Sequence, residues 1–383
     1  MADDPSSERG AGDANRALFA YCLRRPEGVE GMRTSWRWGA LVVLAALSVV
    51  IAGTVGGTTA APSSTLVVTS YGGPWEQFLR KEILPGFESE TGAKVELSVG
   101  LSRDWVAKIR APGRQNPPFD VIIANTTWVS AIRKEGFFAK LTADKVSNLK
   151  DVWPELRLKD DVGVITLVGP LGIAYRKDLV TNPPKTWKDL WNPDYKGKLG
   201  LYSVANSANP MFMMLVSRIY KGNDRDIDFA ISKIKELRPF RQTDFSGDME
   251  ILLTRGEITV GILDSPAASR LKAQGLPIEW VFPREGVFMF EQDTNVLEAA
   301  QNKELAFRFV NYFLSRAVQE KWAGQFWWTP ASRAVKITGK LAQEIPVHTQ
   351  VQFRQIMKWD WDWVNAGARE EMINKWNREI LGR

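Results

Sequence analysis

The chain has 383 residues, of which 44% are hydrophobic and 25% are charged. This length favours two or three domains, and the composition is that of a globular protein, which excludes a wholly disordered chain. The formal net charge of +6 is mixed in sign along the chain and contains no block of Lys and Arg, so we expect no nucleic-acid partner.

The first 61 residues differ from the rest. Residues 1–31 form a polar extension without periodicity, so Met32 is either the true start or follows an unusual extension. Residues 32–61 have the form of an export signal, with Arg33 and Arg37, an apolar run and a small-residue tail. The apolar run is short for a bilayer span of about 20 residues, which favours a cleaved signal over a permanent anchor. We therefore expect a periplasmic protein.

From Leu66 onward, short apolar runs alternate with amphipathic stretches. In chain order, the patterns predict a strand at 66–71, a helix at 75–91, a strand at 94–100, a helix at 102–111, a strand at 119–125, a helix at 127–141 and a pair of strands within 163–180. After a Pro-rich connector, they predict a helix at 225–238, a helix and strand in each of 249–265 and 269–283, a long helix at 302–323 and a C-terminal helix within 349–383 broken near Gly367. Strands that alternate with helices indicate an α/β fold with largely parallel sheets.

Two residue types limit the possible chemistry. Cys22 is the only cysteine and precedes the export signal, so the mature chain has no disulfide and no cysteine for lipid attachment. His348 is the only histidine and is most simply a surface residue, so a Ser/His/Asp or Cys/His catalytic set is disfavoured, and a zinc site of His and Cys is excluded. An all-carboxylate site stays open, although no suitable loop is present. We expect neither an enzyme nor a cofactor.

Recognition of a ligand is the remaining possibility. In open parallel sheets, ligands bind at the loops that follow the carboxyl ends of strands. Three such loops combine polar and aromatic residues, and they supply the candidate ligand-binding residues Tyr71, Gly72, Trp75, Asn125, Thr126, Trp128, Tyr202, Asn206 and Ser207. Aromatic rings offer apolar contact area and can hold a cation, while hydroxyl and amide groups fix orientation. The alternative for Trp75 and Trp128 is that each packs against the sheet.

Two charged residues are further candidates. Asp264 ends a β-branched strand, where it either faces a cleft or caps the following helix. Arg103 opens a predicted helix and could meet a carboxylate or phosphonate there, or it could be an exposed helix residue.

The order of segments resembles the periplasmic substrate-binding proteins of ABC importers, in the branch that contains spermidine/putrescine-binding proteins. The resemblance spans roughly residues 66–383. It is carried by FDVIIANTTWVSAIRKEGFFAKL, KTWKDLWNPDYKGKLGL, GEITVGILDS and PREGVFMFEQDTNVLEAAQNKELAFRFVNYFLS.

This resemblance implies a two-lobed periplasmic-binding-protein fold of type II, in which each lobe is a mostly parallel sheet flanked by helices. The implied parts are lobe 1 at 66–167 and 292–326, lobe 2 at 168–291 and 327–383, and a hinge of strands that cross near Leu167, at 290–293 and at 327–332. A solute would be trapped between the lobes as they close. The glycines of the first loop would let its backbone approach the solute.

The chain departs from this family at the positions that hold polyamines. Relatives use carboxylates for the ammonium groups and tryptophans for the methylene chain, whereas the corresponding positions here are Val204, Ser207, Asp264, Phe290 and Gln292. Because burial of an ammonium ion without a carboxylate is costly, a di- or triamine is disfavoured. Asp264, together with Glu291 or Asp293, could still hold one ammonium.

We therefore predict a monomeric periplasmic solute-binding protein of an ABC importer. It would capture a small polar, nitrogen-containing solute, such as a polyamine-, opine- or amino-acid-derivative-like molecule, and deliver it to a membrane permease. An enzyme on the same two-lobed fold and a signal-anchored sensor domain remain as alternatives.

Overall fold

The computed structural model describes residues 65–382. The predicted extension at 1–31 and the export signal at 32–61, including Cys22, lie outside these residues. Across 65–382, no helix has both the length and the apolar character needed to span a bilayer.

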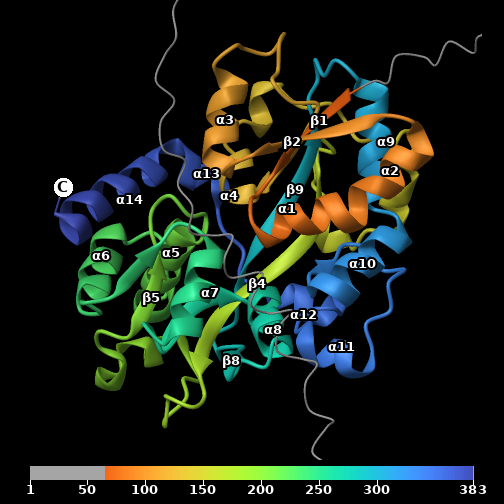
Figure 1. Ribbon diagram of the computed structural model, residues 1–383. Coiled ribbons are helices and arrows are strands. Elements are labelled where there is room, and N and C mark those ends of the chain that lie inside the picture. Colours follow the sequence, from red (N-terminus) through yellow and green to blue (C-terminus); the bar gives the residue numbers. More distant parts are fainter. Residues whose placement is uncertain (1–64, 383) are drawn as a thin grey trace, which may run out of the picture. The chain divides into compact units, whose positions relative to one another are not determined.

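A ten-stranded sheet organises the described residues (Figure 1). At one end lies the first strand group, in which parallel strands run in the order β2 (Lys94–Val99), β1 (Thr65–Ser70) and β3 (Val121–Asn125). At the other end lies the second strand group, which comprises the parallel strands β7 (Val260–Asp264), β5 (Leu199–Tyr202) and β6 (Arg241–Thr243). The predicted α/β fold with parallel strands in both halves is confirmed.

Two long strands join these groups. β9 (Phe288–Val296) pairs with β3, β4 (Val164–Arg176) pairs with β7, and the two long strands pair with each other, all antiparallel. The prediction of two strands within 163–180 is wrong, because β4 is continuous over 13 residues. Its ladder with β9 continues through Gly169 and Pro170, so neither residue ends the strand.

The three predicted crossing points are neighbours in this sheet. Leu167 of β4 pairs with Gln292 of β9 on one side and with Pro330 of the short strand β10 (Thr329–Pro330) on the other. We propose this level of the sheet as the hinge, with the lobe boundaries at the residues stated above.

Helices cover both faces of the first strand group. One face packs against α1 (Pro74–Phe78), α2 (Leu84–Thr91), α9 (Lys303–Phe313) and α10 (Arg316–Phe326), and the other packs against α3 (Ser102–Arg110) and α4 (Thr126–Val129). The predicted helix at 127–141 is wrong beyond its first turn. Gly136 adopts a left-handed φ of 76°, and Phe137 and Phe138 are buried beside the sheet instead of continuing a helix.

The predicted helix at 302–323 is also interrupted. Ser315 lies between α9 and α10 with extended backbone, and its side chain accepts a hydrogen bond from the backbone of Val318. This contact is an N-cap, so the chain begins a new helix there.

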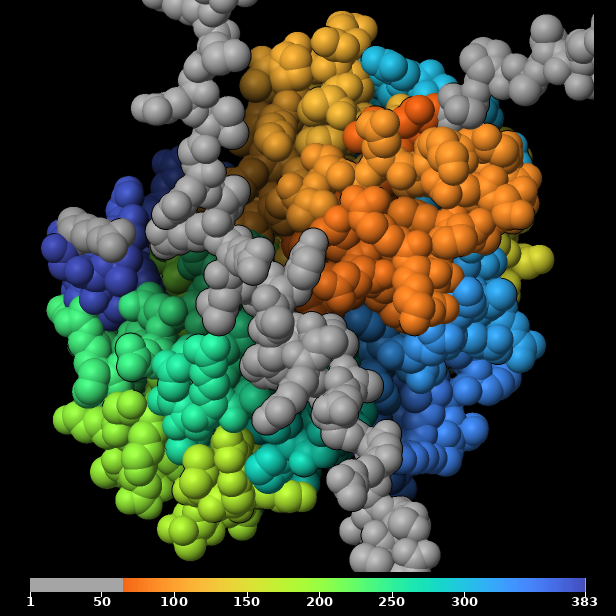
Figure 2. Space-filling model, viewed as in Figure 1, coloured from red at the N-terminus to blue at the C-terminus, as the bar shows by residue number. Residues whose placement is uncertain are grey.

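The second strand group packs against α5 (Ala208–Lys221), α6 (Ile227–Lys235), α7 (Ser246–Arg255) and α8 (Ser265–Ala273), while β8 (Ile278–Val281) pairs with β4. The sequence patterns missed α5, since residues 208–217 are all buried and show no alternation with polar positions. In space-filling form, α1 and α2 (orange) and α7 and α8 (green to teal) occupy different regions of the visible face (Figure 2).

The C-terminal segment contributes α11 (Gly339–Glu344), α12 (Gln350–Arg354), α13 (Trp361–Trp363) and α14 (Arg369–Trp376). Gly367 has a φ of 134°, which a residue with a side chain rarely adopts, so the predicted break near Gly367 is confirmed. Beyond the break, α14 contacts both α5 and α6 (Figure 1).

Candidate functional site

One face of the central strands gathers several of the predicted residues. Successive side chains of a strand point to opposite faces, and directly paired residues share a face. In β9, Phe290 and Gln292 therefore point to one face, which we call the Gln292 face. Gln292 pairs with Asn125 of β3, and Phe290 pairs with Gly169 of β4.

Asp264 belongs to the same face. Leu171 of β4 pairs with both Asp264 and Phe288, and Phe288 lies two residues before Phe290. Asp264 is buried, and its Oδ1 accepts a hydrogen bond of 3.0 Å from the backbone N–H of Ala267. The predicted helix cap is thus present. A role of Asp264 in binding stays a prediction.

An aromatic wall borders this face on the side of the first strand group. The indole of Trp75 is buried, with ring centroids 4.4 Å from Trp322 and 5.1 Å from Trp328. Trp328 covers Gly169, since a Cβ added to Gly169 would lie 2.9 Å from Cη2 of Trp328. Trp75 therefore packs as the alternative interpretation expected, and its cluster extends to the Gln292 face through Trp328.

Tyr71 lies behind this wall. Its ring centroid is 5.8 Å from that of Trp75, and its hydroxyl is hydrogen-bonded to Oγ of Ser102 at 2.7 Å. Burial raises the pKa of Tyr71 above its usual range. In the same loop, Gly73 has a φ of 69°, which the turn into α1 requires, and a Cβ on Gly72 would lie 3.2 Å from Val99.

Tyr202 approaches the Gln292 face from the second strand group. Its ring makes an edge contact with Phe290 at a centroid distance of 6.2 Å, and its hydroxyl is 3.0 Å from Oγ of Ser246. Burial raises the pKa of Tyr202 well above its usual value, and the negative charge of Asp264 adds to this effect. Both strand groups thus contribute side chains beside β9.

Several buried polar atoms near this face lack a partner. Within residues 65–382, no hydrogen bond reaches Nε1 of Trp75, Nε1 of Trp328, Nδ2 of Asn125 or Oε1 of Gln292. Buried polar side-chain atoms in folded proteins are nearly always hydrogen-bonded. A polar ligand at this face would supply the missing partners.

The structure places other candidates elsewhere. Arg103 is about half exposed and forms an ion pair of 3.4 Å with its neighbour Asp104, as the exposed-residue alternative expected. Trp128 is buried in the core that α3 and α4 form on the opposite side of the sheet, and the guanidinium of Arg369 lies 4.6 Å from its ring centroid. Neither residue contacts the Gln292 face in the hydrogen bonds and ring contacts of the described residues.

Asn206 and Ser207 hold the turn into α5. Oδ1 of Asn206 accepts a hydrogen bond from the backbone of Ala208, and Nδ2 donates to the carbonyl of Asp244, both at 2.8 Å. The carbonyl of Ser207 lies 3.5 Å from Oγ1 of Thr127. That contact connects the loop after β3 with the loop after β5. Asn206 thus fixes the turn through its side chain, and Ser207 joins the two loops through its carbonyl.

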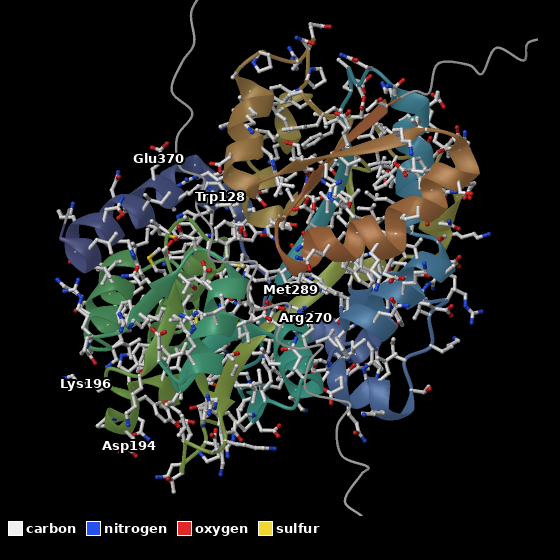
Figure 3. All side chains as sticks on the ribbon, viewed as in Figure 1. Trp128, Asp194, Lys196, Arg270, Met289 and Glu370 are labelled. Atoms are coloured by element: carbon white, nitrogen blue, oxygen red, sulfur yellow. The ribbon has the colours of Figure 1, made fainter. Side chains whose placement is uncertain are left out.

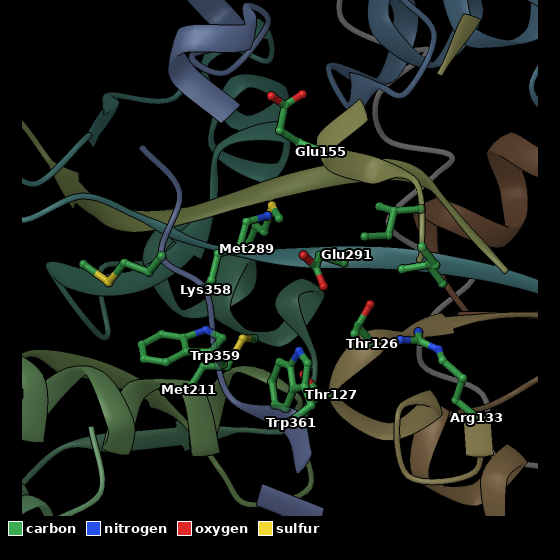
Figure 4. Close-up of a pocket in the computed structure, with 13 residues that line it drawn as sticks. Thr126, Thr127, Arg133, Glu155, Met211, Met289, Glu291, Lys358, Trp359 and Trp361 are labelled. Atoms are coloured by element: carbon green, nitrogen blue, oxygen red, sulfur yellow. The ribbon is translucent and has the colours of Figure 1, made fainter. Parts of the chain in front are cut away.

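A cavity of about 190 Å³ lies on the other face of β9 (Figure 4). Met289 and Glu291 line it together with Thr126, Trp359 and Trp361, and Figure 4 shows Glu291 and Thr126 directed into it. Thr126 therefore lines this cavity and does not belong to the Gln292 face. Among the described residues, its Oγ1 has no hydrogen-bond partner.

The acidic residues of β9 do not join Asp264. Glu291 and Asp293 alternate with Gln292, so both point away from the Gln292 face. The carboxylate of Asp293 is buried and contacts the guanidinium of Arg133. The expectation that Glu291 or Asp293 would share one ammonium with Asp264 is therefore wrong.

Sequence reasoning missed two side chains beside this face, Trp328 and Arg270. Trp328 was not among the predicted site residues, although a glycine inside an apolar strand, such as Gly169, is a sign of close approach by another group. Arg270 follows Asp264 by six residues and is the first long side chain of α8, after SPAAS. That spacing was the available signal.

Arg270 is part of a buried charged cluster. Its Nη2 donates to Oε1 of Glu250 at 2.8 Å, and both side chains are less than 15% exposed. Its guanidinium lies 4.5 Å from the ring centroid of Phe326 in α10. Burial raises the pKa of Glu250, which Arg270 opposes, and burial likewise raises the pKa of Asp264.

The chain is similar to several known proteins. The spermidine/putrescine-binding periplasmic protein of Salmonella typhimurium is 28% identical over 309 residues, which cover 77% of this chain and 87% of that protein. The putrescine-binding periplasmic protein SpuD of Pseudomonas aeruginosa is 24% identical, over 70% of this chain and 78% of that protein. An ABC transporter substrate-binding protein from Bradyrhizobium japonicum has a similar structure, with a TM-score of 0.69 at 17% identity, covering 82% of this chain and 98% of that one. Bacterial extracellular solute-binding proteins share a sequence profile that matches residues 83–344, and this chain belongs to that family.

Proposed function

We propose that the chain is the periplasmic solute-binding protein of an ABC importer. It captures a small polar, nitrogen-containing solute at the Gln292 face and delivers it to a membrane permease. Membership of the extracellular solute-binding family and the names of the polyamine-binding relatives support this proposal. Because the family consists of binding proteins, we propose no catalytic role.

The observation that carries the proposal is the set of buried polar atoms without partners at a place reached by both strand groups. The atoms without partners belong to Asn125 and Trp75 of the first group and to Gln292 on the strand between the groups. The second group contributes the side chains of Asp264 and Tyr202, which already have hydrogen-bond partners. A solute can favour a closed arrangement only through contacts that exist in that arrangement and not in the open one. Side chains from both groups provide such contacts.

The composition of the face argues against a polyamine as the solute. Asp264 is the only carboxylate that the register places beside Phe290 and Gln292, and one of its oxygens already caps α8. A single ammonium group can be held there, whereas a second would be buried without a counter-charge, which is costly. A monoamine or an amino-acid derivative therefore fits better than a di- or triamine.

Calorimetric titration of the purified chain tests this proposal. A thermal-shift screen of amines, opines and amino acids first identifies a ligand, since a ligand present at 100 times its Kd stabilises the folded state by about 2.7 kcal/mol. Gln292→Ala should then weaken binding of that ligand about tenfold or more, or about 1.4 kcal/mol.

Arg103→Ala is the matched control, because Arg103 is exposed and lies on α3. It should leave the affinity unchanged. Equal affinities of the wild type and Gln292→Ala would refute the proposed site, and a ligand that the chain converts into product would refute the proposed role.

A further inference from the structure

Arg270 is the most unusual side chain near the Gln292 face. One of its nitrogens, Nη2, binds Glu250, while Nη1 is buried and has no hydrogen-bond partner within residues 65–382. Figure 3 shows Arg270 near the place where α8 approaches α10, and the contact with Phe326 connects the two helices. A buried guanidinium with an unused N–H needs an acceptor.

This guanidinium adjoins the aromatic wall. Phe326, which it covers, also makes an edge contact with Trp75 at a centroid distance of 6.2 Å, and Trp75 in turn contacts Trp328. On its other side, Arg270 is close enough to Asp264 to oppose the rise in its pKa. Arg270 thus lies between the carboxylate of the second strand group and the indoles of the first.

The unpartnered atoms around it are mostly donors. The indole N–H groups of Trp75 and Trp328 and the N–H of Arg270 can donate hydrogen bonds but cannot accept them. A diamine is itself only a donor when it is protonated, so it could satisfy none of the three. A molecule with carboxylate or phosphate oxygens could satisfy all of them.

We propose that the solute carries an oxyanion, a carboxylate or a phosphate, that accepts hydrogen bonds from Nη1 of Arg270 and from the indole N–H groups beside it. Glu250 holds the guanidinium in place through Nη2 and leaves Nη1 for the solute. A cationic nitrogen at the other end of the same molecule suits Asp264. The inference rests on the proposed function, since it names the class of solute that the same site takes.

The inference also changes which arginine we expect to bind the anionic group of the solute. Arg103 was the expected partner of an anionic group, yet it is about half exposed and is paired with Asp104. The side chain of Arg270 is only 14% exposed, and a charge-assisted hydrogen bond is stronger at such a position than at an exposed one. The two arginines therefore provide a matched comparison within one protein.

Titration calorimetry with paired probes tests the inference. Putrescine and 4-aminobutyrate have the same four-carbon chain, but the second carries a carboxylate in place of one amine. Ethanolamine and O-phosphoethanolamine share the same amine and differ by one phosphate. We expect the oxyanion member of at least one pair to bind about tenfold or more tightly than its counterpart, and the pair that responds distinguishes carboxylate from phosphate.

Substitution then tests the anchor. Arg270→Met should reduce the affinity for that oxyanion roughly tenfold to a hundredfold, whereas Arg103→Met should not change it. Because Arg270→Met leaves Glu250 buried without its partner, the double variant Arg270→Met/Glu250→Gln provides a second background without an unpaired carboxylate. The same loss of affinity is expected in both backgrounds.

Three outcomes would count against these ideas in different ways. Tighter binding of putrescine than of every oxyanion probe would overturn the inference and the preference for a monoamine, and would leave the proposed role as a solute-binding protein intact. Undiminished oxyanion binding by a folded Arg270→Met variant would also overturn it. Failure of amines, amino acids and oxyanions alike to bind would count against the proposed function and with it the inference.

Discussion

Replacement of Gly169 by alanine tests the packing that shapes the Gln292 face. An added Cβ would lie 2.9 Å from Cη2, 3.0 Å from Cζ3 and 3.3 Å from Cζ2 of Trp328. Carbon atoms in good contact are about 3.5–4.0 Å apart, so the indole must move by several tenths of an ångström or more. Overpacking of a buried site typically costs about 1–3 kcal/mol, and we expect the free energy of unfolding of Gly169→Ala to fall by that amount.

A double-mutant cycle separates this contact from other effects. All three crowded atoms belong to the outer ring of the indole, and phenylalanine at position 328 does not reach as far. Gly169→Ala should therefore cost less than about 0.5 kcal/mol in a Trp328→Phe background, which gives a coupling energy of roughly 1–2 kcal/mol. Urea denaturation followed by circular dichroism measures all four proteins.

Gly324→Ala serves as the control for the glycine substitution itself. Gly324 lies inside α10, and no described atom lies within 4 Å of an added Cβ there. Alanine should raise stability by about 0.5–1 kcal/mol, because glycine is unfavourable in a helix. The same cost for Gly169→Ala in the wild-type and Trp328→Phe backgrounds would refute the proposed contact, and with it the position of Trp328 on this face.

Two further predictions concern buried carboxylates. Burial raises the pKa of Asp293 to about 6, although the positive charge of Arg133 opposes this rise. Folding therefore takes up a proton between about pH 4 and pH 6. The contribution of Asp293 to the free energy of unfolding should fall as the pH rises through that interval and level off above it. This effect amounts to at most about 3 kcal/mol, and urea denaturation from pH 3 to pH 8 should show a smaller decline for Asp293→Asn than for the wild type; identical slopes would contradict the prediction. Asp264→Ala removes the acceptor for the N–H of Ala267, so the free energy of unfolding, measured by thermal or urea denaturation, should fall by about 1 kcal/mol. Asp264→Asn should retain most of the cap. Equal losses of stability in the two variants would exclude the capping role.

The strands of the first group could be predicted because their hydrophobic pattern is local. Thr65–Ser70 and Val121–Asn125 are short apolar runs bounded by polar or turn residues, which is typical of buried strands. The continuous strand Val164–Arg176 could not be predicted in the same way. Gly169 and Pro170 at its centre predict an interruption. The strand continues through them because it pairs with β9, which lies more than a hundred residues away in the sequence.

The sequence patterns failed to predict a helix where its residues are completely buried, and they extended a helix too far where a long-range contact ends it. α5 is buried on all sides over its first ten residues, so it lacks the polar face that makes a helix visible in a sequence. The segment after Val129 has the hydrophobic spacing of a helix, but Phe137 and Phe138 instead pack in one buried cluster with Leu297. The break at Gly367 was predictable because glycine itself permits the required backbone angle.

The candidate site was predictable in part. Asn125 and Asp264 follow from the positions of predicted strands, and Gln292 follows from the family resemblance; strand register then places all three on one face. The spacing of Arg270 from Asp264 is visible in the sequence, but its contact with α10 depends on the orientation of α8, which local spacing does not encode. Trp328 lies at the third expected crossing, but its position over Gly169 follows only from the structure, in which β10 pairs with β4.

The central position of β9 also constrains how the chain is made. β3 and β4 lie on either side of β9, so each presents an open edge of unsatisfied amides and carbonyls until Phe288–Val296 has been synthesised. Both open edges therefore exist from the synthesis of Arg176, where β4 ends, until the synthesis of Val296, where β9 ends. A chaperone that binds the nascent chain until β9 has been synthesised would protect these edges from pairing with other chains.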